Sequence, residues 1–447
     1  MTANISTTSV AASHSANAVM RLLRLGASSA LLLRVLLVGA VLLMHLLMAN
    51  WMTPAEYGIF SYVAALVPTL AIVAKLGVPT AALRFVPAYV AQEDWAQLKG
   101  FLRFSGRAVV LALTTIILSG ACVLAIFRWS LRPDVATGLM WSFLLLPGFA
   151  GMQILQDLLR SFKRIVLSQV LEFFVIPVTL CGVIVAVHYS GRPLVSSTVL
   201  GVQFVLVLTA SFVLFVFIRH AVPAEIAQVT AVSRDLYWLR IAVPLGICGV
   251  ISSLLTRIDI LVLGSMLGSE QVALYVAPAK LATLLGFGLA AIIVVASPLI
   301  SEAHGLSDQR QLQQVVSVTT KWAVLGTLPL AICFTVFGRQ FLGWFGPEYV
   351  NSIHVLYLLI LAQMVNVIVG VVEPLLAMTG HQRDYLFVMS CVLIGNLICL
   401  PIAVILGGVG GAAAVSLGSM VIWKLWLARI AYVRLGIDVT IFHCFRR

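Results

Sequence analysis

The residues best suited to chemistry in this sequence are basic side chains that interrupt long apolar segments. Arg34, Arg257 and Lys280 each lie inside an apolar run long enough to cross a bilayer. A charge at membrane depth costs about 2.5 to 3.5 kcal/mol on insertion scales, so each one marks a candidate binding site. Arginine and lysine donate charge-assisted hydrogen bonds to phosphate and carboxylate groups. We therefore expect a cationic cavity for an anionic ligand, with an interfacial anchor as the alternative role for Arg34.

Three acidic residues, Asp259, Glu172 and Glu373, also lie inside apolar segments. Arg257 and Asp259 are separated by about 200° around a helix, so they cannot pair on one helix face. One arrangement pairs Asp259 with Lys280 of a neighbouring helix and leaves Arg257 facing the cavity. The three carboxylates are candidates for coupling transport to an ion, and the alternative is that they only hold helices together.

Motifs for enzymatic chemistry are missing from the sequence. It has no metal-ligand cluster, no GxSxG, no phosphate-cradling glycine loop followed by Lys and Ser or Thr, and no DxD-like carboxylate pair. The seven cysteines lack metal-ligand or redox spacing. We therefore predict no catalytic residue, no metal and no cofactor, and expect that the protein is not an enzyme.

The composition places the chain among integral membrane proteins. Of its 447 residues, 61% are apolar and 10% are charged, which a soluble fold could not accommodate. The net charge of +12 would suggest nucleic acid in a soluble protein, but the basic residues are dispersed through loops between apolar runs. We expect membrane lipids, and no nucleic acid, as partners.

The apolar runs predict an all-α bundle of about twelve membrane-spanning helices. A helix needs about 20 apolar residues to cross a hydrocarbon core of about 30 Å. Prolines inside the runs, such as Pro68, Pro244 and Pro329, suit helices that bend. The predicted spans are 26–51, 58–77, 107–127, 137–156, 166–188, 196–218, 240–263, 272–299, 318–338, 352–376, 385–406 and 409–432.

The distribution of basic residues predicts the orientation of these spans. With the N-terminus inside, the inner loops and inner helix ends hold nineteen of the 28 Lys and Arg residues, and the outer loops hold four. Cytoplasmic loops carry the excess of Lys and Arg in multi-pass proteins. We therefore predict that both termini are cytoplasmic.

The least hydrophobic interior stretch, 220–238, divides the spans into two sets of six. The segment that begins at Glu56 aligns with the one that begins at Gln271, and Pro87 aligns with Pro298. Six spans per half give both halves the same orientation, so the sequence predicts two parallel repeats around a central cavity. The predicted organisation is a cytoplasmic segment 1–25, a lobe 26–219, a cytoplasmic linker 220–238, a lobe 239–433 and a cytoplasmic tail 434–447.

Several short motifs resemble those of a known family in order and spacing. They are Thr53-Pro-Ala-Glu-Tyr-Gly, Leu83-Arg-Phe-Val-Pro-Ala-Tyr, Ala277-Pro-Ala-Lys-Leu-Ala, Phe345-Gly-Pro-Glu-Tyr, Met378-Thr-Gly-His-Gln-Arg and Gly407-Gly-Val-Gly-Gly-Ala-Ala-Ala. Together they resemble the oligosaccharide flippases of the polysaccharide biosynthesis protein family, within the superfamily that also holds multidrug and toxin extruders. The resemblance runs from about Arg24 to Gly436. The chain departs from the family in having Ala273 where a Gly is common, and in ending after twelve predicted spans where some relatives have fourteen.

The resemblance implies two six-helix lobes in a V around a cationic cavity, with a polyprenyl-pyrophosphate-linked oligosaccharide as cargo. Arg34 and Arg84 match basic positions of the family's first lobe, and Arg257 is a looser match. The implied function is a flippase that moves this cargo across the bacterial cytoplasmic membrane for surface polysaccharide synthesis. Lipopolysaccharide or exopolysaccharide would be the product, and a polymerase and glycosyltransferases of the same pathway would be partners.

Three other functions are compatible with parts of the sequence. A drug or metabolite antiporter of the same fold should have a more acidic first-lobe cavity, and Arg34 argues against cationic drugs. A membrane scaffold for glycan assembly would not depend on Arg34 or Arg257. A membrane-bound glycosyltransferase is disfavoured by the missing carboxylate pair.

Overall fold

The computed structural model describes residues 38–127, 132–162, 164, 170–306 and 308–439, and within these ranges the chain forms helices and no strands. The first half contains the helix Val38–Trp51, α2 (Pro54–Ala74), α3 (Val78–Ala91), α4 (Trp95–Phe127), α5 (Pro133–Ser161), the π-helical turn η1 (Leu171–Val175), α7 (Ile176–Tyr189) and α8 (Ser196–Ala221). The second half contains η2 (Ala224–Ala227), α9 (Asp235–Leu255), α10 (Ile258–Met266), α11 (Ser269–Leu284), α12 (Gly286–Gly305), α13 (Gln309–Val336), α14 (Gly338–Gly343), η3 (Pro347–Ser352), α15 (Ile353–Ile368), α16 (Val372–Met378) and α17 (Gln382–Leu435). The predicted all-α fold is confirmed.

Within the described residues, eight helices are long and apolar enough to cross a membrane, or nine if α11 and α12 form one bent span. Two shorter apolar helices, Val38–Trp51 and α7, occupy the places of the predicted first and fifth spans. The non-helical Gly408 divides the 54 residues of α17 into two arms, which correspond to the predicted eleventh and twelfth spans. The helices therefore follow the predicted order of spans.

The second-half helices are interrupted more often than the sequence suggested. Residues 256 and 257 separate α9 from α10, the axis bends by 45° between α11 and α12, and Gly370 lies between α15 and α16 with φ +61°. In contrast, Pro68, Pro244 and Pro329 lie inside continuous helices. The breaks therefore do not coincide with these prolines.

The segment between the second and third spans also differs from expectation. The predicted spans 58–77 and 107–127 leave the residues between them outside any span. Instead α3 ends at Ala91, and α4 begins at Trp95 and continues for 33 residues. Asp94 caps this start, because its carboxylate accepts a hydrogen bond from the Gln97 backbone N–H at 3.0 Å. The residues between these two predicted spans thus form a separate helix, α3, and the first turns of the long helix α4.

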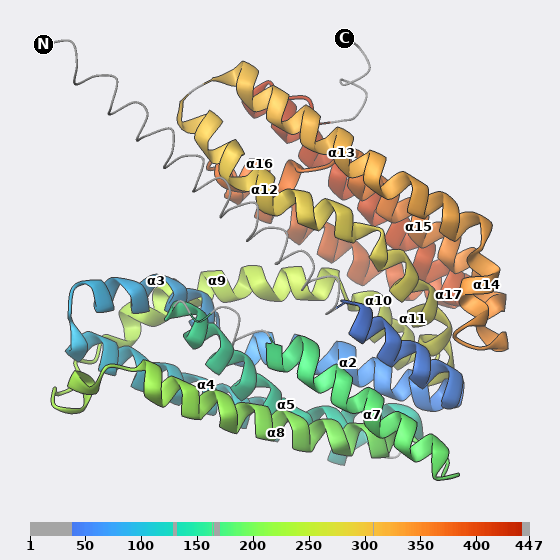
Figure 1. Cartoon of the computed structure of the whole chain (residues 1–447), viewed down its shortest axis with the longest axis horizontal. Helices are drawn as coiled ribbons and strands as arrows, with labels where there is room; N and C mark the ends of the chain where they lie inside the picture. The colour runs from blue at the N-terminus through green and yellow to red at the C-terminus, as the bar shows by residue number, and fades with distance from the viewer. Residues whose placement is uncertain (1–37, 128–131, 163, 165–169, 307, 440–447) are drawn as a thin grey trace, which may run out of the picture.

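The helices form two groups that meet at one end of the molecule and diverge toward the other (Figure 1). The N-terminal lobe comprises Val38–Trp51 and α2 to α8, in which α5 packs against α2, α3 and α8. The C-terminal lobe comprises α10 to α17, in which α13 packs against α12 and α15, and α15 packs against α17. We call the end that carries α14 and η3 the closed end, and the end that carries α3 and the α12–α13 junction the open end (Figure 1).

The two lobes are joined at the closed end by polar and close backbone contacts. The Ser269 backbone N–H of α11 donates to the Asp134 carboxylate of α5 at 2.8 Å, and Asn50 Nδ2 donates to the Trp344 carbonyl at 3.1 Å. Gly58 of α2 lies so near α11 that a Cβ there would be 1.8 Å from the Ser269 carbonyl oxygen. These contacts leave little room between the lobes at this end.

The helix α9 links the two lobes. It packs against α2 and α3 of the N-terminal lobe, and also against α17. Its continuation α10 packs against α11 and α17 of the C-terminal lobe, and less extensively against α2. The chain therefore changes lobes at the break between α9 and α10.

Candidate functional site

A cavity of about 430 Å³ lies where the two lobes adjoin the α9–α10 break. Its lining comes from Val38–Trp51 and α2 on one side and from α10, α11, α15 and α17 on the other. Its polar lining includes His45, Arg257, Asp259, Tyr275, Lys280 and Ser416. The cavity thus combines residues from the first and second halves of the sequence.

Arg257 occupies the break itself, which holds it partly exposed in the cavity wall. Its backbone has φ −138° and ψ −6°, outside the helical region, and it caps α10. Its Nη1 donates to Ser253 Oγ at 3.0 Å and to Thr256 Oγ1 at 3.3 Å. Among the described residues no carboxylate forms an ion pair with it. Both bonds use Nη1, so the remaining guanidinium N–H groups keep the capacity to bind an anion.

Lys280 of α11 is the second cation of the cavity. It lies close enough to Arg257 for the two charges to interact, and close enough to His45 to influence that ring. The structure gives the Lys280 ammonium no ion pair among the described residues. Two like charges in a partly dehydrated space repel each other, and an anion between them would relieve that repulsion.

Asp259 does not pair with Lys280, so the pairing suggested from the sequence is wrong. Its carboxylate instead accepts hydrogen bonds from the Tyr275 hydroxyl, from Ser416 Oγ at 3.4 Å and from the Ile260 backbone N–H at 3.1 Å. The neutral donors satisfy the carboxylate without neutralising it. Asp259 lies in the first turn of α10, where the helix dipole also favours a negative charge.

His45 has a defined structural partner. The ring is buried, and its Nδ1 lies 3.1 Å from the Tyr57 hydroxyl. The Tyr57 ring in turn meets Tyr349 edge-to-face at a centroid distance of 6.2 Å, which joins α2 to η3. His45 is thus a hydrogen-bonded packing residue between Val38–Trp51 and α2.

The N-terminal lobe holds a second group of charged side chains, for which the sequence predicted no role. Lys75 Nζ donates to Gln153 Oε1 at 2.8 Å and lies 3.8 Å from the Asp157 carboxylate. Arg160 Nη1 donates to Asp157 Oδ1 at 3.0 Å within α5. The spacing of Asp157 and Arg160 by three residues is a detectable helix-surface pair, but the contribution of Lys75 depends on the packing of α2 against α5.

Glu172 adjoins this charged group. It lies in the π-helical turn η1, where the carboxylate interacts with Lys75 and Arg160. Glu172 is not among the residues that line the central cavity, so the structure places this candidate in the N-terminal lobe and not beside Lys280.

Glu373 has a different environment from the other acidic candidates. Its carboxylate forms an ion pair with Lys424 of α17, with Oε1 2.5 Å from Nζ. Lys424 is 1% exposed and also lies over the Trp423 ring, 5.5 Å from its centroid. The pair joins α16 to α17.

The two remaining basic candidates are not part of the described cavity wall. Arg84 is exposed on α3, where its guanidinium lies 5.8 Å from the centroid of the Phe85 ring. Arg34 lies outside the described residues. Within the part of the chain that the structure describes, no group of three or more His, Cys, Asp or Glu residues could hold a metal ion.

Comparisons with solved structures define the fold. An inward-facing multidrug resistance MATE family transporter of the MOP superfamily matches with a TM-score of 0.69 at 15% identity, covering 89% of this chain and 94% of that one. The lipid II flippase MurJ, in an inward closed conformation, matches with a TM-score of 0.69 at 13% identity, covering 89% and 86% of the two chains. An outward-facing MATE family transporter matches with a TM-score of 0.58 at 15% identity, covering 89% and 93%. The chain has the fold of the MOP-superfamily transporters.

Family models give a more specific assignment. The model for polysaccharide biosynthesis proteins matches residues 24–304, and the MatE model matches residues 244–405. The chain therefore belongs to the polysaccharide biosynthesis protein family, as the sequence resemblance indicated. No curated protein sequence matches it significantly.

Proposed function

We propose that this protein is a flippase that carries a polyprenyl-pyrophosphate-linked oligosaccharide from the inner to the outer leaflet by alternating access. The observation that carries the proposal is the cavity between the lobes, where Arg257 and Lys280 lie without an ion-pair partner among the described residues. A pyrophosphate needs such donors, and the family and the MurJ-like fold supply the transporter class.

The dimensions of the cavity agree with the binding of a head group rather than of the whole lipid. Its volume of about 430 Å³ is within the range of drug-sized ligand sites. A diphosphate and an adjoining sugar fit such a volume, whereas a long polyprenyl chain does not. The tail would remain in the bilayer while the charged head group crosses between the lobes.

The shape of the molecule supports a cargo that binds from the cytoplasm. The excess of Lys and Arg predicts that the open end, with α3 and the α12–α13 junction, faces inward. The contacts from Asp134 to Ser269 and from Asn50 to Trp344 then close the outer end. In this state the cavity would accept cargo from the inner leaflet.

The other sequence candidates have subsidiary roles in this proposal. Arg84, exposed on α3, and Arg34 would meet the pyrophosphate on its way to Arg257 and Lys280. Asp259, Glu172 and Glu373 are the candidates for ion coupling. The protein would work in the bacterial inner membrane with both termini cytoplasmic, beside a polymerase and glycosyltransferases that make surface polysaccharide.

Substitution of the two cavity cations tests the proposal. In proteoliposomes, a labelled polyprenyl-pyrophosphate-linked sugar becomes accessible to an added glycosidase when it reaches the opposite leaflet. We expect Arg257→Gln and Lys280→Gln each to slow this flipping by about 10- to 100-fold, because a hydrogen bond to a charged group contributes about 1.5 to 3 kcal/mol. Arg257→Lys should restore part of the rate.

The matched control is Arg339→Gln, which removes an exposed arginine from α14 at the closed end, away from the cavity. It should flip the lipid at the wild-type rate. Wild-type flipping by both cavity variants would contradict the assignment of these cations to the pyrophosphate. Absence of flipping by the wild-type protein itself would agree with a scaffold role instead.

A drug or metabolite antiporter is the second candidate, because the MatE model matches residues 244–405 and a multidrug transporter has the same TM-score as MurJ. The Asp259–Tyr275–Ser416 group is the feature that a cationic drug or a proton would use. In that case Asp259→Asn should abolish cation efflux, and Lys280→Gln should increase it by removing a repulsive charge.

A further inference from the structure

The linker that joins α8 to α9 is fastened to α4 near the open end. Lys99 Nζ donates to the Val229 carbonyl at 2.8 Å, and the Val232 backbone N–H donates to the Ala96 carbonyl at 3.1 Å. Gly100 permits this approach, because a Cβ at that position would lie 1.9 Å from the Val232 carbonyl oxygen. The linker and the first turns of α4 therefore form one surface.

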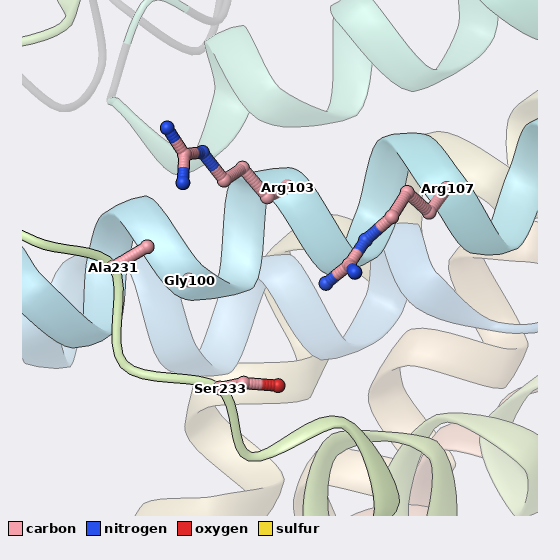
Figure 2. A pocket seen from close by; sticks show the side chains of 5 residues that line it. All are labelled: Gly100, Arg103, Arg107, Ala231 and Ser233. Carbon is pink, nitrogen blue, oxygen red and sulfur yellow. The ribbon is translucent and has the colours of Figure 1, made fainter.

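A basic pocket of about 360 Å³ opens on this surface, lined by Gly100, Arg103, Arg107, Ala231 and Ser233. Figure 2 shows Arg103 and Arg107 on successive turns of α4; Arg107 points toward the side where the linker residues Ala231 and Ser233 lie, and Arg103 points away from them. Arg103 is exposed and has no ion pair among the described residues. The pocket thus has a fixed floor and an arginine that is free to turn toward a ligand.

Arg107 is partly engaged by an acidic neighbour. It lies 3.3 Å from the Asp235 carboxylate, which also accepts a hydrogen bond from Ser233 Oγ at 2.7 Å. Arg234 is exposed next to these residues. With three arginines and one aspartate, the rim keeps a net positive charge that a phosphate would complement.

An apolar groove of about 570 Å³ continues from the same arginine. Its lining includes Arg107 itself, Val73 and Leu76 from the end of α2, and Leu111 and Ile116 from α4. Leu111 is 70% exposed, as expected for a side chain that faces lipid. The distance from Arg103 to Ile116 along α4 is about 20 Å, enough to cross one leaflet of a core about 30 Å thick.

From this combination we infer that the groove between α4, α2 and α9 binds an anionic glycerophospholipid of the inner leaflet. The phosphate lies at Arg103, Arg107 and Ser233, and one acyl chain follows the groove toward Ile116. Basic pockets beside membrane helices on the cytoplasmic side recognise acidic lipid head groups. The apolar continuation selects a lipid over a free phosphate.

This site is distinct from the central cavity. The basic pocket and the groove share no lining residue with the cavity that contains Arg257 and Lys280. The helix α4 packs mainly against α2, α3, α5 and α9. A lipid there would join α4 to the start of α9 and would not be cargo, so the inference does not depend on the proposed function.

Native mass spectrometry of the full-length protein in detergent, titrated with phosphatidylglycerol, measures the binding. We expect wild type to bind phosphatidylglycerol in preference to phosphatidylcholine, and Arg103→Gln and Arg107→Gln each to weaken the interaction about fivefold. Ala112→Trp, which fills the groove, should also weaken it. Arg310→Gln is the matched control, because this exposed arginine lies at the start of α13 on the opposite lobe.

The outcomes separate a lipid from other anions. Glycerol 3-phosphate, which carries the head-group phosphate without acyl chains, should not compete with phosphatidylglycerol at equal concentration. Equal binding of phosphatidylglycerol by wild type and by the Arg103→Gln/Arg107→Gln double variant would overturn the inference. Effective competition by glycerol 3-phosphate would also overturn it, since the groove would then contribute nothing.

Discussion

Two of the environments that hold charged side chains within the apolar segments differ sharply. Glu373 and Lys424 satisfy one another at 2.5 Å, with the lysine almost completely buried. Arg257 and Lys280 line a cavity and have no such partner among the described residues. A closed pair holds helices together, whereas open charges can meet a ligand. The distinction depends on which helices are neighbours, so the sequence identified Arg257, Lys280 and Glu373 as candidates but could not assign them different roles.

The Glu373–Lys424 pair gives a prediction about stability. Glu373→Gln leaves the buried Lys424 ammonium without a counter-charge, and we expect the free energy of unfolding in detergent to fall by about 3 to 5 kcal/mol. Adding Lys424→Met removes the stranded charge and should recover most of the loss. Thermal unfolding followed by tryptophan fluorescence measures both changes.

Glu302→Gln provides the reference for that experiment. Glu302 is an exposed carboxylate on α12, and its neutralisation should change stability by about 0.5 kcal/mol or less. A Glu373→Gln variant as stable as Glu302→Gln would show that the ion pair does not hold α16 against α17.

At the scale of elements, the apolar runs predicted the helices and their order, but they did not predict the breaks. Interruptions at Arg257 and Gly370 fall within apolar runs that are long enough for one continuous span, so the length of a run does not reveal them. Helices with internal prolines, such as α9 and α13, stay continuous because neighbouring helices support them. The sequence also does not predict the close crossing of α9 over the α2–α3 junction, because that crossing depends on which helix backbones approach each other.

That crossing gives a prediction with a built-in control. Gly77 has φ +73°, and a Cβ there would be 2.0 Å from the Ala242 carbonyl oxygen of α9. Gly77→Ala therefore adds a backbone clash to the cost of a left-handed conformation. Gly191 has φ +69° with no atom near its Cβ position, so Gly191→Ala carries the conformational cost alone, about 1 kcal/mol.

We expect the free energy of unfolding of Gly77→Ala to be lower than that of Gly191→Ala by about 1 to 3 kcal/mol, which is the usual cost of overpacking. Thermal unfolding of the two purified variants provides the comparison. Equal losses in both would mean that α9 can move away from α2 and α3 without cost.

On the scale of the whole molecule, the lobes meet at the closed end and diverge at the open end (Figure 1). Two parallel repeats around a cavity were predictable from the spacing of the spans, and the fold agrees with that expectation. The conformational state was not predictable, because one sequence must encode both the open and the closed form of each end. Nor could the sequence place Lys75 and Asp157 near Glu172, since their proximity depends on packing in the N-terminal lobe.

A cross-link at the closed end tests whether the lobes must separate there during transport. Asp134 and Ser269 lie on different lobes, with the carboxylate 2.8 Å from the Ser269 backbone nitrogen. In a background with the seven native cysteines replaced by serine, Asp134→Cys/Ser269→Cys should form a disulfide on oxidation. The oxidised protein should lose at least about 90% of its transport, because alternating access requires this end to open.

Reduction should restore activity to the oxidised variant, and either single cysteine variant should be insensitive to oxidant. Transport at an unchanged rate by the fully cross-linked protein would show that the closed end is not a gate.

The crossover of the chain between α9 and α10 has a mechanical consequence. If the lobes swing about the place where one polypeptide passes between them, Arg257 stands near the fulcrum. A point near a fulcrum travels a short arc while the far ends of the levers travel a long one. Arg257 would thus stay almost stationary while the two ends of the molecule open in turn. A bound anion would keep its contact with Arg257 during this change of conformation.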